Sequence, residues 1–179
     1  MASKIKVDQI QTADGTGTIA LQNQLSGMTT ASLPALGSAQ MPTGSVLQVV
    51  TLADTGSVSG TSQITSSGVS ITPSSSSNKV LLLFNMAIET NSGGGGGTDR
   101  GIACKLFRDS TEIYSQPYEF YSSARGSGDQ QIGNVTYTML DSPASTSSVT
   151  YKFKLTPTSG TARMNEYGDS FLTLMEIAG

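Results

Sequence analysis

The stretch that decides the fold is Val149-Thr150-Tyr151-Lys152-Phe153-Lys154-Leu155. Apolar residues occupy every second position, and the positions between them hold threonine and lysine. Successive side chains of a β-strand point to opposite faces of the sheet, so this pattern buries one face and leaves the other in water. The stretch therefore predicts an antiparallel strand that covers one side of a core.

Similar short segments recur along the chain from residue 46 onward. Together with Ser148–Leu155, the expected strands are Val46–Leu52, Ser62–Thr65 with Val69–Ile71, Lys79–Glu89, Gly101–Arg108, Glu112–Tyr118, Ile132–Leu140, Ala162–Asn165 and Ser170–Ile177. Clusters of Gly, Pro, Asn and Ser separate them, and no window shows the periodicity of a helix. Many short strands at regular spacing are typical of a β-sandwich or barrel.

Two of these segments are apolar on both faces. Residues 79–84 read Lys-Val-Leu-Leu-Leu-Phe, and residues 171–177 read Phe-Leu-Thr-Leu-Met-Glu-Ile, with Phe171, Met175 and Ile177 on one face. Such strands are expected in the middle of a structure or at a contact between subunits. This doubled apolarity indicates oligomerisation.

The N-terminal region differs from the rest of the chain. Its apolar residues are too sparse to form a core, and one hairpin is marginally stable at best in water. We expect this region to be extended and to anchor the protein on other copies of the chain or on another protein. The candidate anchoring residues are Ile5, Val7, Ile10, Ile19 and Leu21. The expected organisation is an anchoring and trimerisation region at 1–40, a linker at 41–45 and a sandwich at 46–179.

Composition and charge exclude several classes of partner. The net charge is −3 and the ten Lys and Arg residues form no run, whereas nucleic-acid binding requires a basic patch. No apolar stretch approaches the ~20 residues that span a bilayer. The chain shows no signal peptide, so we expect synthesis and release in a cytosol.

The chain offers few means of catalysis. It has no histidine and one cysteine, Cys104, so Ser-His-Asp, Cys-His and thiolate metal sites are excluded. Gly93–Gly97 precedes a strand rather than a helix, which favours a flexible loop over a phosphate-binding loop. Cys104 alternates with Ile102 and Leu106 and is expected to be buried. We expect no catalytic, cofactor or metal site, although paired carboxylates leave a glycosidase conceivable.

An aromatic cluster with a nearby arginine is the candidate recognition surface. Tyr and Arg are enriched where proteins bind partners, and the candidates are Tyr118, Tyr121 and Arg125, close to Tyr114 and Phe120. The alternative is that the tyrosines are ordinary sheet residues with outward hydroxyl groups. The loop 122–129 and Gly93–Gly97 could form a rim beside them.

Several short motifs resemble those of a known family. The segment Lys4-Ile5-Lys6-Val7-Asp8-Gln9-Ile10-Gln11-Thr12, followed by Asp14-Gly15-Thr16-Gly17, resembles the N-terminal signature of tail-fibre and related virion proteins of marine and freshwater bacteriophages, including cyanophages. The distal part is similar to the C-terminal β-sandwich of that family in Ile71-Thr72-Pro73-Ser74-Ser75, Lys105-Leu106-Phe107-Arg108-Asp109, Leu140-Asp141-Ser142-Pro143 and Leu174-Met175-Glu176-Ile177. The resemblance covers nearly the whole chain.

This resemblance implies an all-β homotrimer in the virion, made in the host bacterial cytoplasm. Its N-terminal segments would dock on other virion proteins, either a tail adaptor or nozzle protein or the major capsid protein. Its jelly-roll-like antiparallel sandwiches would pack around a threefold axis and could recognise a host surface glycan. It implies no nucleic acid and no membrane insertion.

One departure from the family keeps two functions open. Typical fibres have a long shaft between their two ends, and this chain has almost none. A short tail fibre for host attachment is the first expectation, and a capsid cement or decoration protein is the alternative. A glycan-degrading tailspike is disfavoured by length and by the lack of a carboxylate pair that the sequence places together.

Overall fold

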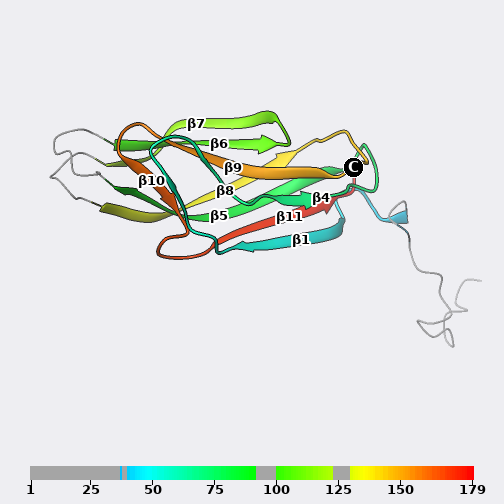
Figure 1. The fold of residues 1–179 in the computed structure, drawn as a ribbon. Helices are drawn as coiled ribbons and strands as arrows, with labels where there is room; N and C mark the ends of the chain where they lie inside the picture. Colours follow the sequence, from blue (N-terminus) through cyan, green and yellow to red (C-terminus); the bar gives the residue numbers. More distant parts are fainter. Residues whose placement is uncertain (1–36, 38–39, 92–99, 123–129) are drawn as a thin grey trace, which may run out of the picture. The chain divides into compact units, whose positions relative to one another are not determined.

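The computed structural model describes residue 37 and residues 40–91, 100–122 and 130–179 (Figure 1). In these ranges the chain forms strands β1 (Val46–Asp54), β2 (Val58–Gly60), β3 (Ile64–Thr65), β4 (Val69–Ile71), β5 (Lys79–Asn91), β6 (Arg100–Arg108), β7 (Thr111–Ser122), β8 (Gln130–Asp141), β9 (Val149–Pro157), β10 (Thr161–Met164) and β11 (Ser170–Ile177). The strands lie in two antiparallel sheets packed face to face, so the predicted antiparallel sandwich is confirmed.

The strands pair in a nested order. β6 pairs with β7, β5 with β8, β4 with β9, and β1 with β11. Each pair encloses the previous one in sequence, from the β6–β7 hairpin outward to the first and last strands. One sheet has the order β8-β5-β11-β1, and the other has the order β7-β6-β9-β4. This succession of antiparallel pairs over two sheets is the topology of a jelly roll.

Strands β10 and β11 act as one interrupted strand. Both run antiparallel to β5, with Met164 opposite Ile88 and Phe171 opposite Asn85. β1 pairs with β11 and β2 pairs with β10, so β1 and β2 form the next interrupted strand of the same sheet. The residues between Met164 and Phe171 therefore leave the plane of the sheet as a large bulge, here called the β10–β11 loop.

The core lies between the two sheets and contains an aromatic cluster. The Phe153 ring centroid is 5.2 Å from that of Phe84 and 4.7 Å from that of Tyr137. Val149, Tyr151, Phe153 and Leu155 are all buried, as their alternation in sequence predicts. Cys104 is also buried, which confirms the prediction for this thiol.

Most expected strands are present, with boundaries shifted by a few residues. The sequence did not predict β2, whose three residues include one apolar side chain and a glycine. The segment expected as a linker joins the sandwich through backbone hydrogen bonds, because Gly44 N–H donates to Ala178 and Ala178 N–H donates to Ser45. Residues 1–36, and with them the anchoring candidates, lie outside the described part of the chain.

A buried carboxylate holds the β4–β5 loop against the last strand. Glu176 is 1% exposed and accepts hydrogen bonds from Gln48, from the Asn78 amide, and from the backbone N–H and hydroxyl of Ser74. Burial by itself raises the pKa of Glu176, but these donors outweigh it and hold the pKa below its ordinary value. The ionised carboxylate therefore stabilises this end of the sandwich.

Replacing Glu176 with glutamine is expected to lower the free energy of unfolding by ~2 kcal/mol at pH 7, because an amide accepts fewer of these hydrogen bonds. The carboxylate contribution is fully present above the unfolded pKa, close to 4.5, and is lost as the pH falls through the lower folded pKa. The difference between the wild type and Glu176→Gln should therefore shrink from about pH 5 to about pH 3 in urea unfolding.

The matched control is Glu112→Gln, which removes an exposed carboxylate paired with Lys105 at 2.7 Å. Exposed ion pairs contribute about 0–1 kcal/mol, so this variant should differ little from the wild type at either pH. An equal loss of stability in the two variants, or a Glu176→Gln effect that does not change with pH, would contradict the assignment.

Candidate functional site: an apolar sheet face and an acidic pocket

The outer face of the β8-β5-β11-β1 sheet carries a row of apolar side chains. Val49 lies opposite Met175, Met175 opposite Leu81, and Leu81 opposite Leu140, so one apolar side chain comes from each strand. Paired residues of an antiparallel sheet point to the same face. This row therefore crosses the whole width of the sheet.

The neighbouring rows extend this surface. Val46 pairs with Ile177 on one side, and Leu83 lies between Thr173 and Thr138 on the other. We call the combined set the apolar face: Val46, Val49, Leu81, Leu83, Leu140, Met175 and Ile177. Strands ~4.8 Å apart and rows ~7 Å apart give this face a projected area of roughly 400 Å², the size of the largest apolar patch on a typical monomer, which is often a functional surface.

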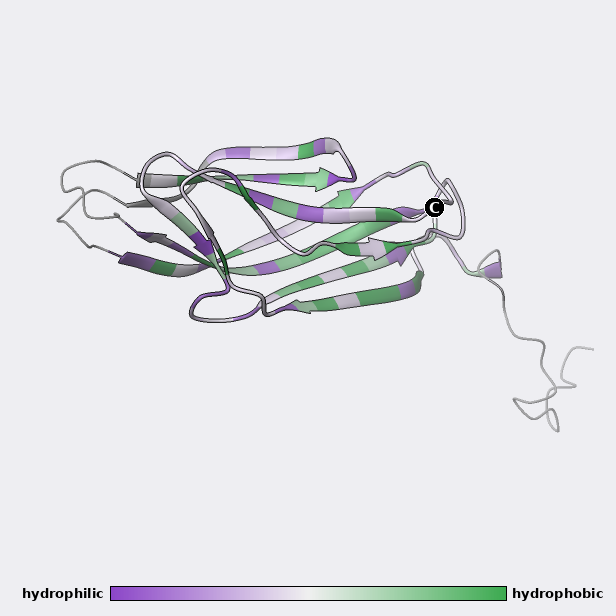
Figure 2. Cartoon of the chain, viewed as in Figure 1, coloured by the Kyte–Doolittle hydropathy of each residue, from purple (hydrophilic) through white to green (hydrophobic). Residues whose placement is uncertain are grey.

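Exposure confirms that this surface faces outward. Val46, Val49 and Leu140 are each about half exposed, at 50%, 53% and 53%. Figure 2 shows hydrophobic colouring along β1 and β11, whereas β7 and β9 carry hydrophilic bands. The other sheet presents polar contacts on its outer face, including the Lys105–Glu112 ion pair and the Lys154 ammonium 4.0 Å from the Phe107 ring centroid. The two outer faces therefore differ in chemistry.

A pocket lies on the same sheet beyond the apolar face. It has a volume of about 280 Å³ and is bounded by β5, β8 and the β10–β11 loop. We call it the acidic pocket, and its polar side chains are Asn85, Glu89, Asn134, Glu166, Tyr167 and Asp169. Phe171 lies at its edge towards β11 and is 54% exposed.

Hydrogen bonds fix the loop that walls the acidic pocket. Asn165 N–H donates to the Ala87 carbonyl at 3.0 Å, and Ala87 N–H donates to the Ser170 hydroxyl at 3.1 Å. The Asn165 amide also donates to the Gly56 carbonyl at 3.1 Å. The two ends of the loop are thus attached to β5 at one residue, and the side chains between them project away from the sheet.

Glu89 is the most enclosed carboxylate of the acidic pocket. It is 1% exposed, and neither carboxylate oxygen has a hydrogen-bond donor among the described residues. Its one ion pair is with Arg163, at 3.8 Å, and Arg163 also lies 3.6 Å from Glu166. Buried carboxyl groups without donors are rare, so Glu89 is an unusual part of the pocket wall.

A second charged cluster joins the two sheets. The Arg108 guanidinium donates to both Asp141 oxygens, at 2.9 and 2.7 Å, and the Tyr151 hydroxyl donates to Asp141 at 2.7 Å. Burial, together with the contact with Asp141, raises the pKa of Tyr151 far above its ordinary value. Tyr151 therefore remains a protonated donor, and the cluster fastens β8 to β6 and β9.

No group of three or more acidic or cysteine side chains that could hold a metal ion occurs in residues 40–91, 100–122 and 130–179. In the same ranges no helix is long and apolar enough to cross a membrane.

The structure gives little information on the recognition candidates taken from sequence. Tyr118 and Tyr121 belong to β7, but their side chains lie outside the described set, as does the whole of Arg125. The same holds for Gly93–Gly97, and the anchoring candidates Ile5, Val7, Ile10, Ile19 and Leu21 also lie outside. The Tyr114 ring contacts that of Tyr137, with centroids 5.3 Å apart, which agrees with an ordinary sheet position for this tyrosine.

Sequence reasoning missed the acidic pocket and the reach of the apolar face. No pattern in the sequence places Glu89 beside Glu166 and Asp169, which line the same pocket. A usable signal was the short run Asn165-Glu166-Tyr167-Gly168-Asp169 between two expected strands, since an aromatic side chain in a polar loop is often exposed.

Comparison with known proteins shows only distant likeness. No family model matches the chain, and no curated protein does. Among solved structures, the VP2 subviral particle of infectious bursal disease virus has 13% identity and a TM-score of 0.43 over 82% of this chain and 37% of that chain. The Gx strain structure of the same virus has 12% identity, a TM-score of 0.40 and the same coverage.

The Stig cyclase Fisc from Fischerella sp. TAU has 16% identity and a TM-score of 0.34 over 65% of this chain and 56% of that chain. This chain therefore spans about 37% of the viral chains. Likeness at this level is not evidence of a shared function.

Proposed function

We propose that this protein is a structural component of a bacteriophage virion. In this proposal it is a short homotrimeric tail fibre whose N-terminal region attaches to the particle and whose sandwich is presented for host-surface recognition. It works by assembly and binding, without catalysis. The N-terminal signature at residues 4–17 supports the virion assignment.

The observation that carries the assembly part of the proposal is the apolar face. Val46, Val49 and Leu140 on the outer strands are about half exposed, and the apolar side chains between them on β5 and β11 are partly exposed, so this face is costly to leave in water. Lys79 is the one charged residue in the rows that form it, among the residues described. Association with other copies would remove this face from water, and the long Lys79 side chain at its edge can keep its ammonium group in solvent.

The capsid cement or decoration role remains the second candidate. The specific observation in its favour is the short distance in sequence between the N-terminal signature and the sandwich, which leaves almost no shaft. Both functions use the same trimer and differ in the surface of the particle that holds it.

Light scattering of the purified protein is expected to give three times the 18.5 kDa chain mass. A variant without residues 1–40 should remain a trimer, at three times its own smaller chain mass, because the apolar face belongs to the sandwich, but it should no longer bind particles that lack the protein. A monomeric wild type would refute the trimer, and binding of the truncated variant to particles would refute the anchor.

Antibody labelling of intact particles separates the two virion roles. Label at the tail in a small copy number supports the fibre, and label over the shell in many copies supports decoration. Absence of label from both would refute a virion role altogether.

A further inference from the structure

We propose that the acidic pocket binds a neutral sugar unit. The proposal deepens the host-recognition part of the proposed function by naming its ligand class, and it relies on that function only for its biological setting.

The charges of the acidic pocket exclude anionic ligands. Glu89, Glu166 and Asp169 contribute carboxylates to its wall, and among the described residues that line it there is no lysine or arginine. Arg163 lies behind, where it partly offsets Glu89 and Glu166. A phosphate or a uronic acid would meet like charges in this site.

The polar groups match hydroxyls better than cations. Asn85 and Asn134 line the pocket with amides that both donate and accept hydrogen bonds, as a sugar hydroxyl does. The carboxylates of Glu166 and Asp169 are acceptors for hydroxyl donors. A quaternary ammonium ion has no hydrogen-bonding group to offer to either amide, and the Asn85 amide would keep only its hydrogen bond to the Thr136 hydroxyl, at 3.3 Å.

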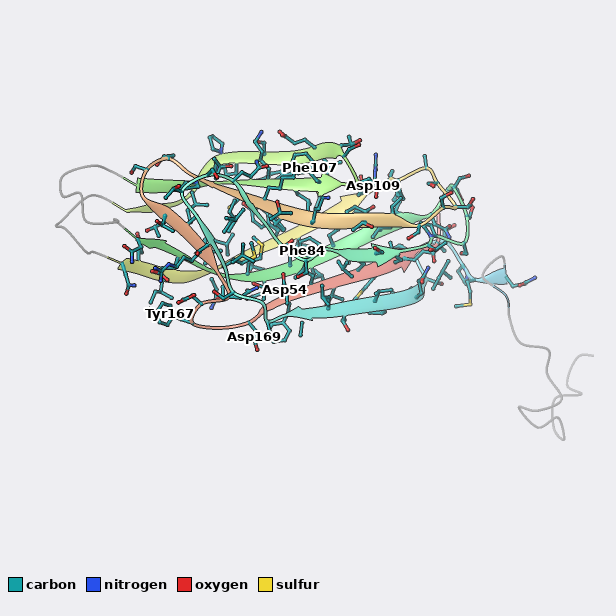
Figure 3. The ribbon with its side chains drawn as sticks, viewed as in Figure 1. Asp54, Phe84, Phe107, Asp109, Tyr167 and Asp169 are labelled. Carbon is teal, nitrogen blue, oxygen red and sulfur yellow. The ribbon has the colours of Figure 1, made fainter. Side chains whose placement is uncertain are left out.

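Two exposed aromatic rings complete the site. Tyr167 is 60% exposed and Phe171 is 54% exposed, and both line the pocket. Figure 3 shows Tyr167 and Asp169 on the β10–β11 loop, outside the two sheets, whereas Phe84 lies between them. Aromatic rings offer a flat apolar surface beside polar groups, which suits the C–H face of a sugar ring.

The size and rigidity of the pocket fit one sugar unit. A volume of about 280 Å³ is at the lower end of the range for small-molecule sites, roughly 300–1,000 Å³. The loop is attached to β5 at Ala87 from both of its ends, so Tyr167 and Asp169 are held in place before a ligand arrives. A preformed site loses less entropy on binding.

The test uses the full-length protein and ligand-observed NMR or calorimetry. The probes are methyl glycosides of glucose, galactose and mannose, with glucuronate as the anion and choline as the cation. At least one neutral glycoside should bind with a dissociation constant of roughly millimolar size. Tyr167→Ala and Asp169→Asn should each weaken that binding by about tenfold or more.

Phe107→Ala is the matched control, because it removes an aromatic ring from the outer face of the opposite sheet. It should leave binding unchanged, and thermal unfolding of every variant should show that each is folded. The proposal is overturned if no neutral glycoside binds, if glucuronate or choline binds more tightly, or if Phe107→Ala weakens binding as much as Tyr167→Ala.

The oligomeric mass and attachment to particles are measured on the same samples. If the wild type is a particle-bound trimer that binds no glycoside, the sugar site fails and the virion role stands. If it binds a glycoside through Tyr167 but neither trimerises nor attaches, the virion role fails and the sugar site stands.

Discussion

The wild type is expected to be a trimer, and the double variant Val49→Arg/Leu140→Arg is expected to be a folded monomer. Both side chains are about half exposed and lie at the two ends of the central apolar row. Arginine at these positions can extend into water in a monomer, so the sandwich keeps its core. In the trimer the added charges would be buried without partners, at a cost of several kcal/mol for each interface.

Light scattering checks this result, and circular dichroism confirms that the variant is folded. Ser115→Arg is the control, because it adds the same charge to an exposed position on the outer face of the other sheet. It should remain a trimer. A trimeric double variant, or equal dissociation of Ser115→Arg, would show that subunits meet through another surface.

The second large effect is expected in the core. Replacing Phe153 with alanine should lower the free energy of unfolding by about 3–5 kcal/mol. Phe153 is fully buried, at 0% exposure, and its ring contacts Phe84 and Tyr137. The loss is a large share of the 5–15 kcal/mol that typically stabilises a domain.

Urea unfolding at one fixed protein concentration measures this loss, since association with other copies contributes to apparent stability. Phe107→Ala should cost much less, because Phe107 lies on the outer face under Lys154. A loss below about 1 kcal/mol for Phe153→Ala would mean that the aromatic cluster does not hold the two sheets together.

Local alternation was enough to predict most strands but not their partners. The pattern at residues 149–155 depends only on which side chains are apolar, and the structure buries the expected face. The nested pairing of β1 with β11 joins residues from the two ends of the domain. Nothing in either segment alone encodes that register, which emerges from the burial of both sheets together.

Residues 171–177 are apolar on both faces, which predicts a contact between subunits but does not show which face belongs to the core. The structure buries Leu172 and Leu174 and turns Phe171, Met175 and Ile177 outward. Because both sets are apolar, hydrophobicity alone does not show which set faces the core. The buried Glu176 shares the inner face, which a polarity argument would have assigned to solvent.

The acidic pocket could not be predicted because its walls are far apart in sequence. β5, β8 and the β10–β11 loop meet only after the jelly roll has formed. In the sequence, the loop looks like an ordinary connection between two neighbouring strands. In the structure, the strands before and after it both pair with β5, so the loop is a bulge within one interrupted strand.

The nested pairing also governs when the domain can form during synthesis. β11 lies between β1 and β5, so the sheet has a gap at its centre until residues 170–177 have left the ribosome. Until then β1 has no hydrogen-bonded neighbour in the described sheet, and residues 79–85 of β5 are paired along one edge only. Pairing of distant segments is slow, and incomplete sheets aggregate. The nascent chain therefore cannot close its sheets until residues 170–177 are available for pairing, and the emergence of β11 is the step that commits the domain to folding.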